Sequence, residues 1–187
     1  MAGGPGGVKK AYTAYAAQGG DGSSNLETRA KLWGYDADFL AGLGFDDEKA
    51  AELFAGACGG GCPLRIDGGG HIKAGDRVVD LGCGFGHDLV LANRIVGPTG
   101  RVVAVDSTIA MLEVCGKNFE KFGVRCCELW HNALDDGAIN GGADVVISNG
   151  VFNLTRNKRE AFAAAFRLLK PGGVLLLSDV CRTSKPS

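Results

Sequence analysis

The sequence has little that would tie it to a membrane or to a polyanion. It contains no run of ~18 apolar residues, the length that a membrane-spanning helix needs. The formal net charge is only −1, which predicts no general attraction to nucleic acid or anionic lipid. The first ten residues, MAGGPGGVKK, lack the apolar core of a secretory signal and the arginine-rich pattern of a transit peptide. We therefore expect no membrane span and no nucleic-acid partner.

The cysteines lack the pattern of a disulfide framework or a metal site. There are seven, an odd number, and they are scattered. This favours reduced thiols in the cytoplasm or another reducing compartment, an organelle matrix included. Cys58 and Cys62 could form half of a zinc site, but no second Cys/His pair follows at suitable spacing, so we expect no metal. Of the neighbouring Cys126 and Cys127, we expect one to be buried and one exposed on a short strand.

The length of 187 residues suits one domain, and glycine is unevenly distributed along it. The 31 glycines exceed the average of ~7% and cluster before residue 71. We expect a glycine-rich N-terminal extension with short helices over 1–70 and a compact domain over 71–187. Helical spacing marks 8–17 and 26–43, and the acids at 46–48 mark a further helix start.

From Gly75 onward, apolar runs alternate with helical patterns. Such alternation indicates parallel βαβ units, and we predict an α/β fold with a doubly wound, mainly parallel, Rossmann-like sheet. The expected strands are 77–82, 101–105, about 124–130, 143–148 and 174–178, and the expected helices are about 86–96, 108–121 and 156–169.

The first strand ends in the most informative segment, Val78 to Gly86, which reads VVDLGCGFG. An apolar run ending in an acid and followed by glycines predicts a buried strand and a tight turn that lets a ligand approach the backbone. The dinucleotide pattern G-x-G-x-x-G fails, because His87 stands where its third glycine belongs. A phosphate-binding P-loop fails as well, since no Gly-Lys-Ser/Thr follows.

The second strand also ends in an acid, Asp106, which lies 20 residues after Gly86. In doubly wound sheets an acid at this place accepts hydrogen bonds from ribose hydroxyls. The alternative is a surface aspartate that caps the next helix at Ser107 or Thr108. The glycine-rich turn before it makes us favour the ribose role.

The pattern D-x-G-x-G-x-G resembles the first motif of class I S-adenosylmethionine-dependent methyltransferases. Residues 70–180 resemble the small-molecule methyltransferases related to arsenite methyltransferase, while residues 1–65 match only loosely. The segments that carry the resemblance are Val78 to Gly86, Val96 to Gly100, Val105 to Thr108, Ile147 to Leu154, Leu168 to Gly173 and Leu177 to Val180. The resemblance implies S-adenosylmethionine as cofactor and a small-molecule substrate.

The resemblance also implies roles for individual residues, although it identifies no catalytic side chain. The methionine portion would be surrounded by Asp80, Gly82, Cys83, Gly84 and Gly86, and Asn149 would close that side. Asp106 would hold the ribose. The adenine would be flanked by Ser107 and Thr108, and its amine would lie near Asn132 and Ala133. Of the histidines, we expect His87 to be a surface helix residue and His131 a strand-end residue.

The sequence departs from the arsenite group in its thiols. Gly150 stands where the family has a cysteine, and the stretch 25–31 lacks the family's N-terminal thiol. Only Cys58 or Cys62 could match a remaining ligand, and one thiol does not make an arsenic site. The expected function is therefore a small-molecule methyltransferase that does not act on arsenic.

The resemblance also implies two further strands after strand five, and these are not in the sequence. We expect a truncated sheet whose fifth strand is an unpaired edge, covered by a protein partner unless the chain is a fragment. The alternative function is therefore a catalytically inactive methyltransferase-fold subunit with a structural role in a larger complex.

Overall fold

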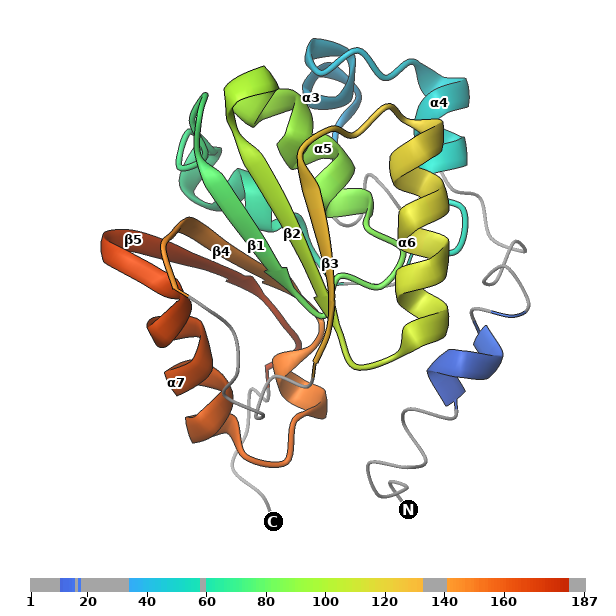
Figure 1. The fold of residues 1–187 in the computed structure, drawn as a ribbon. Helices are drawn as coiled ribbons and strands as arrows, with labels where there is room; N and C mark the ends of the chain where they lie inside the picture. Colours follow the sequence, from blue (N-terminus) through green and yellow to red (C-terminus); the bar gives the residue numbers. More distant parts are fainter. Residues whose placement is uncertain (1–10, 16, 18–33, 58–59, 133–140, 182–187) are drawn as a thin grey trace.

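The structure is a computed structural model that describes residues 11–15, 17, 34–57, 60–132 and 141–181 (Figure 1). Ala133, Cys58 and most of the helical pattern expected before residue 34 lie outside the described residues. No helix within the described ranges is long and apolar enough to cross a membrane.

Five parallel strands form one sheet, which confirms the predicted fold class. Their order across the sheet is β3-β2-β1-β4-β5. The strands are β1 (Arg77–Leu81), β2 (Arg101–Asp106), β3 (Cys127–His131), β4 (Ala143–Asn149) and β5 (Leu169–Ser178). They fall close to the predicted strands, because runs of valine, leucine and isoleucine favour buried parallel strands.

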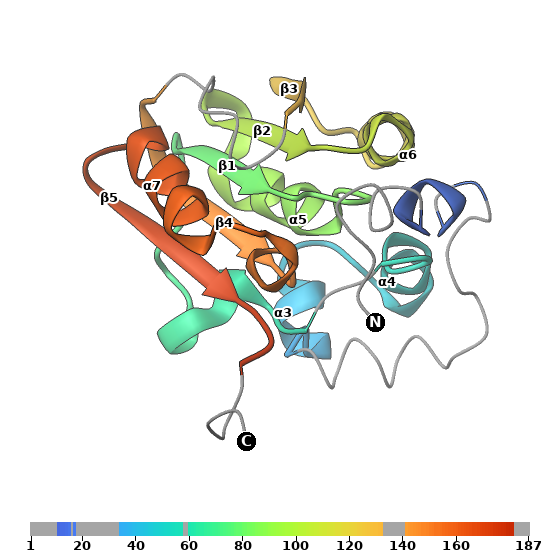
Figure 2. The ribbon, with the colours of Figure 1, turned by 90° about the horizontal axis from the view of Figure 1, so that it is seen from below.

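Helices cover both faces of the sheet (Figures 1 and 2). α5 (His87–Val96) and α6 (Ile109–Lys121) lie on one face, and α7 (Lys158–Leu168) lies on the other. Successive strand residues point to opposite faces, so Val78 packs with the α5 layer and Val79 with α7. This double burial explains why β1 is apolar at consecutive positions. Short 3-10 turns, η2 (Gly97–Thr99) and η3 (Phe152–Leu154), connect these elements.

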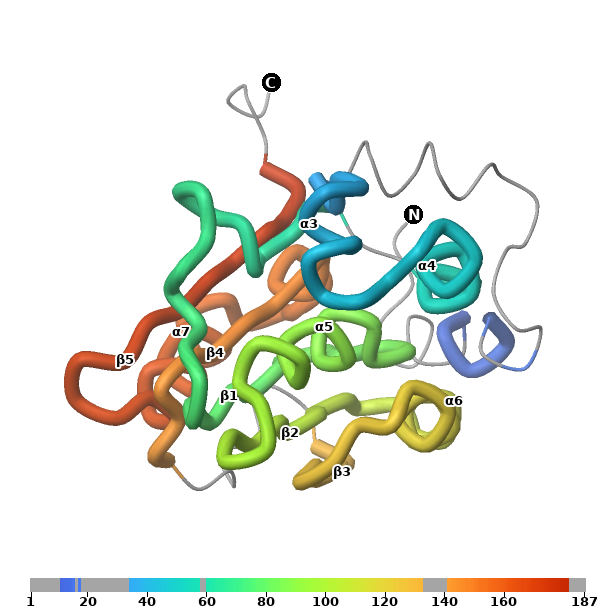
Figure 3. The backbone as a smooth tube through the Cα atoms, turned by 90° about the horizontal axis from the view of Figure 1, so that it is seen from above, coloured from blue at the N-terminus to red at the C-terminus, as the bar shows by residue number. Residues whose placement is uncertain are grey.

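The N-terminal segment packs on the α5 side of the molecule. It contains α3 (Ala37–Gly42), α4 (Asp47–Leu53) and the 3-10 turn η1 (Pro63–Gly68), and Figure 3 shows α3 and α4 beside α5. Asp46 caps α4 by accepting a hydrogen bond from the Lys49 N–H at 2.9 Å, as the acids at 46–48 predict. Residues 34–68 therefore share the core of the sheet domain.

Two expectations need correction. Cys126 and Cys127 are both exposed, because Cys126 has a left-handed φ of 54° just before β3, which is an outer strand of the sheet. β5 begins at Leu169 rather than Val174: Leu169 pairs with Ala143, and the ladder resumes only at Val174 after a register shift. Within the described ranges β5 pairs with β4 alone, so its other side is an edge.

The burial pattern predicts unequal costs for two apolar truncations. Leu91 on α5 is fully buried, so Leu91→Ala should lower the free energy of unfolding by about 2–5 kcal/mol. Phe166 on α7 is 79% exposed, so Phe166→Ala should change it by less than about 0.5 kcal/mol. Urea unfolding followed by circular dichroism measures both values. Equal losses in the two variants would contradict the placement of the core.

Candidate functional site

The parallel sheet gathers the predicted polar residues at one edge. β1, β2 and β4 are neighbours, so Asp80, Asp106 and Asn149 all come to the carboxyl edge of the sheet. The glycine loop from Gly82 to Gly86 joins β1 to α5 at this same edge (Figure 1). Ligands of open α/β sheets bind at such an edge, where the strand order reverses.

The glycine loop is shaped by close packing beneath it and open space above it. The N–H groups of Gly82 and Cys83 both donate to the Val105 carbonyl, at 2.7 and 3.0 Å. Gly82 has a φ of 82°, and a Cβ there would come within 2.4 Å of the Val151 side chain. Gly84 has a φ of 52°, and a Cβ there would meet no described atom within 4 Å. Among the described residues, the space beside Gly84 is therefore open, while the ring of Tyr15 covers Phe85 in the same loop, with centroids 5.9 Å apart.

Asp106 is fixed at the tip of β2 by two backbone hydrogen bonds. Its Oδ2 accepts from the Gly84 N–H at 3.1 Å, and its Oδ1 accepts from the Thr108 N–H at 2.8 Å. A carboxylate has about four lone-pair sites, so two remain for a ligand's hydroxyl groups. Burial raises the pKa of Asp106, although these hydrogen bonds partly oppose that effect. The contact with Thr108 lies just before α6, whose N-cap Thr108 has no side-chain capping hydrogen bond.

Asp80 is a buried carboxyl group with unmet hydrogen-bonding capacity. It is 3% exposed, and its Oδ1 finds no hydrogen-bond partner among the described residues. Burial, followed by the charges of Asp88 and Asp106, holds the pKa of Asp80 well above its usual range. A cationic group placed beside it would relieve both the repulsion and the missing contact.

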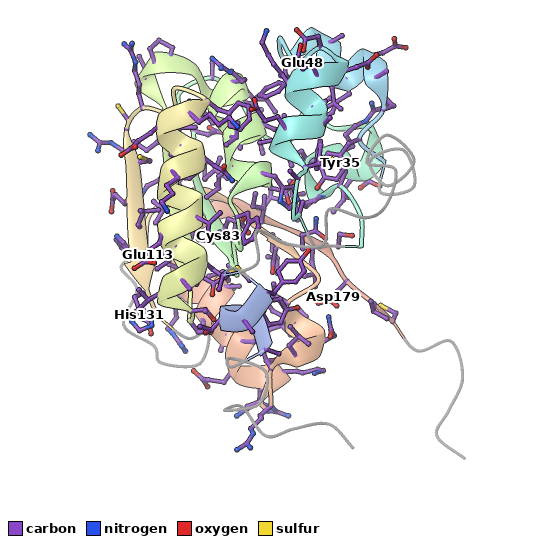
Figure 4. The ribbon with its side chains drawn as sticks, turned by 90° about the vertical axis from the view of Figure 1, so that its right-hand side faces the viewer. Tyr35, Glu48, Cys83, Glu113, His131 and Asp179 are labelled. Carbon is purple, nitrogen blue, oxygen red and sulfur yellow. The ribbon has the colours of Figure 1, made fainter. Side chains whose placement is uncertain are left out.

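Cys83, which Figure 4 labels, is one of the other predicted site residues at this edge. The Cys83 thiol is buried, and a hydrogen bond with Cys115, followed by burial, holds its pKa well above the usual range. Thr108 is buried, and Asn132 donates its N–H to the Asp106 carbonyl at 3.1 Å. His131 ends β3, as expected, and its Nε2 donates to the Ser107 carbonyl at 3.0 Å.

Asn149 directs its side chain toward the N-terminal segment. Its Nδ2 lies 2.7 Å from the Gly61 carbonyl and 3.1 Å from Asp88 Oδ2, and its Oδ1 accepts from the Gly60 N–H at 3.0 Å. Tyr35 donates its hydroxyl to Asp88 Oδ1 at 2.6 Å. Sequence reasoning missed Tyr35 and Asp88, and the only local signal was an acid beside the glycine turn.

The expectation for His87 is wrong. His87 is 4% exposed rather than on the surface, and its ring packs against Phe54 and Tyr35 with centroid distances of 5.5 and 5.9 Å. The reason is that residues 34–57 cover the beginning of α5, which periodicity within the helix does not reveal. Its Nδ1 is buried and finds no partner among the described residues.

A family model described as a methyltransferase domain matches residues 72–186. The chain belongs to this methyltransferase family. Class I enzymes of this family use S-adenosylmethionine, and the observed site fits that cofactor: the orphaned Asp80 oxygen suits the methionine ammonium, and Asp106 retains acceptor capacity for ribose hydroxyls.

Comparison with individual proteins gives the same family. The arsenite methyltransferase of Halobacterium salinarum is 37% identical over 154 residues, which are 76% of this chain and 37% of that protein. The human arsenite methyltransferase is 34% identical over 113 residues, which are 55% of this chain and 30% of that protein. The chain thus spans about a third of the length of these curated relatives.

Solved structures agree. An arsenic(III) S-adenosylmethionine methyltransferase from Chlamydomonas reinhardtii superposes with a TM-score of 0.62 at 32% identity, covering 75% of this chain and 48% of that one. A methyltransferase from Aquifex aeolicus has a TM-score of 0.55 at 21% identity, covering 88% and 79% respectively, and so supports the fold alone.

The glycine loop predicts different effects for two similar substitutions. Gly82→Ala combines a left-handed backbone with a clash against Val151, so it should lower the free energy of unfolding by about 2–5 kcal/mol. Gly84→Ala meets no described atom and should cost about 1–2 kcal/mol, while its methyl group enters the space meant for the ligand. Urea unfolding and calorimetric titration with S-adenosylhomocysteine separate the two effects. A Gly84→Ala variant that binds like the wild type would contradict this assignment of the ligand side.

The raised pKa of Asp80 predicts a pH dependence of cofactor binding. Only the ionised carboxyl attracts an ammonium group, and burial, followed by the charges of Asp88 and Asp106, raises the pH at which Asp80 ionises. The affinity for S-adenosylhomocysteine should therefore increase as the pH rises through this raised pKa. Calorimetry on wild type and Asp80→Asn measures this, and 5′-methylthioadenosine, which lacks the ammonium, is the matched control ligand. An equal pH slope for wild type and Asp80→Asn would refute the role of Asp80.

Proposed function

We propose that this chain is an S-adenosylmethionine-dependent methyltransferase that acts on a small molecule other than arsenite. The observation that carries the proposal is the pairing of two different acids at the carboxyl edge. Asp106 is oriented by the N–H groups of Gly84 and Thr108, and Asp80 is buried with an unmet acceptor. A nucleoside joined to an amino acid complements both groups.

Different residues would contact different parts of such a cofactor. Asp106 accepts the ribose hydroxyls, Asp80 faces the methionine ammonium, and the backbone at Gly84 leaves room for close approach. Ser107 and Thr108 would flank the adenine, and Asn132 would stand near the adenine amine. When bound, the cofactor supplies an electrophilic methyl group on sulfonium, so the protein has mainly to align the acceptor with it.

The thiols near this edge argue against arsenite as the acceptor. Trivalent arsenic prefers several thiolate ligands. Burial, together with the charge of Asp88, raises the pKa of Cys62 to about 12, and the neighbouring Cys115 thiol, followed by burial, holds the pKa of Cys83 well above its usual range. Gly150 carries no side chain to add a third sulfur. These groups do not form a set of thiolates at neutral pH.

A second candidate function, a structural subunit of a larger complex, is favoured by the surface around β5. Within the described ranges one side of β5 is unpaired, and two phenylalanines of the neighbouring α7, Phe162 and Phe166, are 45% and 79% exposed. A protein partner that adds a strand to this edge and covers the aromatic side chains would stabilise it.

Calorimetric titration with S-adenosylhomocysteine tests the proposed enzyme. We expect micromolar binding by the wild type and a loss of about 10- to 100-fold for Asp106→Ala, which removes charge-assisted hydrogen bonds. Glu113→Ala, at an exposed position on α6, is the matched control and should bind like the wild type. A folded wild-type chain that does not bind would exclude the enzyme and leave the structural subunit.

A positive result then calls for methyl-acceptor assays. Arsenite should yield no methylated product under conditions in which a small-molecule panel yields one. Arsenite methylation would overturn the substrate part of the proposal and leave the cofactor part intact.

A further inference from the structure

Three polar side chains from distant parts of the sequence meet in the interior beside the cofactor edge. Tyr35 precedes α3, Asp88 lies in the first turn of α5, and Asn149 ends β4. They are 1%, 1% and 7% exposed. In Figure 4, Tyr35 lies among side chains between the N-terminal helices and the sheet. Burying a carboxyl group here is costly unless its oxygens are hydrogen-bonded.

The hydrogen bonds among these groups are complementary. The Tyr35 hydroxyl donates to Asp88 Oδ1 at 2.6 Å and accepts from Asn149 Nδ2 at 3.1 Å. Asn149 Nδ2 also lies 3.1 Å from Asp88 Oδ2, so its two hydrogens are shared among Tyr35, Gly61 and Asp88, and His87 Nε2 lies 3.4 Å from the same Asp88 oxygen. Burial, followed by the charge of Asp88, raises the pKa of Tyr35 well above its usual value, so its hydroxyl stays a donor.

The same amide of Asn149 holds the chain segment from Gly60 to Cys62, which lies outside the glycine loop. Asn149 accepts from the Gly60 N–H and donates to the Gly61 carbonyl, at 3.0 and 2.7 Å. Gly61 also packs against the end of β5, where a Cβ would lie 2.1 Å from the Ser178 hydroxyl. The segment therefore runs along the carboxyl edge past β4 to β5.

We propose that Tyr35, Asp88 and Asn149 form a latch that keeps the Gly60–Cys62 segment across the carboxyl edge, and that Tyr35 is a positioning residue governing how the methyl acceptor reaches the site. The role of Tyr35 toward the methyl acceptor rests on the proposed function, whereas the latch is a property of the ligand-free chain and can be tested without any ligand. Without the Tyr35 hydroxyl, Asp88 Oδ1 loses its hydrogen-bond donor. Water can replace that donor only if the Gly60–Cys62 segment moves away and exposes the carboxylate.

The buried thiol of Cys62 reports on the latch. Cys62 is 9% exposed and belongs to the segment that the latch holds. Tyr35→Phe removes only the hydroxyl and keeps the aromatic contact with Phe54, whose ring centroid lies 4.7 Å from that of Tyr35. We expect Tyr35→Phe to accelerate alkylation of Cys62 by iodoacetamide at least tenfold in the ligand-free chain, measured on the Cys62 peptide by mass spectrometry.

Two further variants separate the latch from a general loss of stability. Phe122→Leu weakens the contact with Phe45 after the end of α6, at the opposite edge of the sheet from the latch. Phe122→Leu should leave the alkylation rate of Cys62 within twofold of the wild type. The comparison with Tyr35→Phe is made at urea concentrations that give the two variants the same free energy of unfolding. Asp88→Asn should accelerate labelling, and combining it with Tyr35→Phe should add less than the product of the single effects.

The outcomes are distinct for the two proposals. Wild-type labelling in Tyr35→Phe, or equal acceleration in Phe122→Leu, would overturn the latch whether or not the chain binds S-adenosylhomocysteine. A wild-type chain that fails to bind S-adenosylhomocysteine overturns the proposed function, while the labelling result still decides the latch. If the latch and the proposed function both hold, Tyr35→Phe should change the KM for the methyl acceptor more than the affinity for S-adenosylhomocysteine. An equal change in both would contradict the placement of the latch on the acceptor side.

Discussion

β1 pairs in parallel with β2 on one side and with β4 on the other, and this pairing places the ends of all three strands together. Asp80 stands opposite Ala104 and Ile147, so two residues further along the strands Gly82, Asp106 and Asn149 come to the same edge. Helices on both faces make the pairing possible, because they bury the apolar side chains that a parallel sheet presents on both sides. Every feature of the site depends on this register.

Asp80, Asp88 and Asp106 lie close to that edge, and they differ in the hydrogen bonds that their carboxyl groups receive. Asp106 receives two backbone N–H groups, and Asp88 receives the Tyr35 hydroxyl and the Asn149 amide. Asp80 keeps an oxygen that no described group satisfies. Repulsion among buried carboxylates makes the edge receptive to a positive charge. In a structural polar cluster every buried carboxyl oxygen would have a hydrogen-bond partner. The unsatisfied oxygen of Asp80 is instead what we expect of a ligand site.

The sequence predicted those features that arise from nearby residues. Apolar runs and glycine turns predicted a parallel sheet and the approximate positions of its strands, and the spacing from Gly86 to Asp106 placed the acid at the correct strand end. The environment of His87 could not be predicted, because residues 34–57 that bury it are distant in sequence. For the same reason the partners of Asn149 were missed: Tyr35 lies 114 positions away. Long-range packing leaves no periodic trace in either segment.

The bond between Asp106 and the Gly84 N–H has a consequence for the energetics of recognition. It ties the tip of one strand to the turn of its neighbour within the folded chain. The conformational entropy of ordering this turn is therefore lost during folding rather than during binding. Under the proposed function, an incoming nucleoside would meet a turn that is already ordered, and the acid that orders the turn, Asp106, would also receive the ligand.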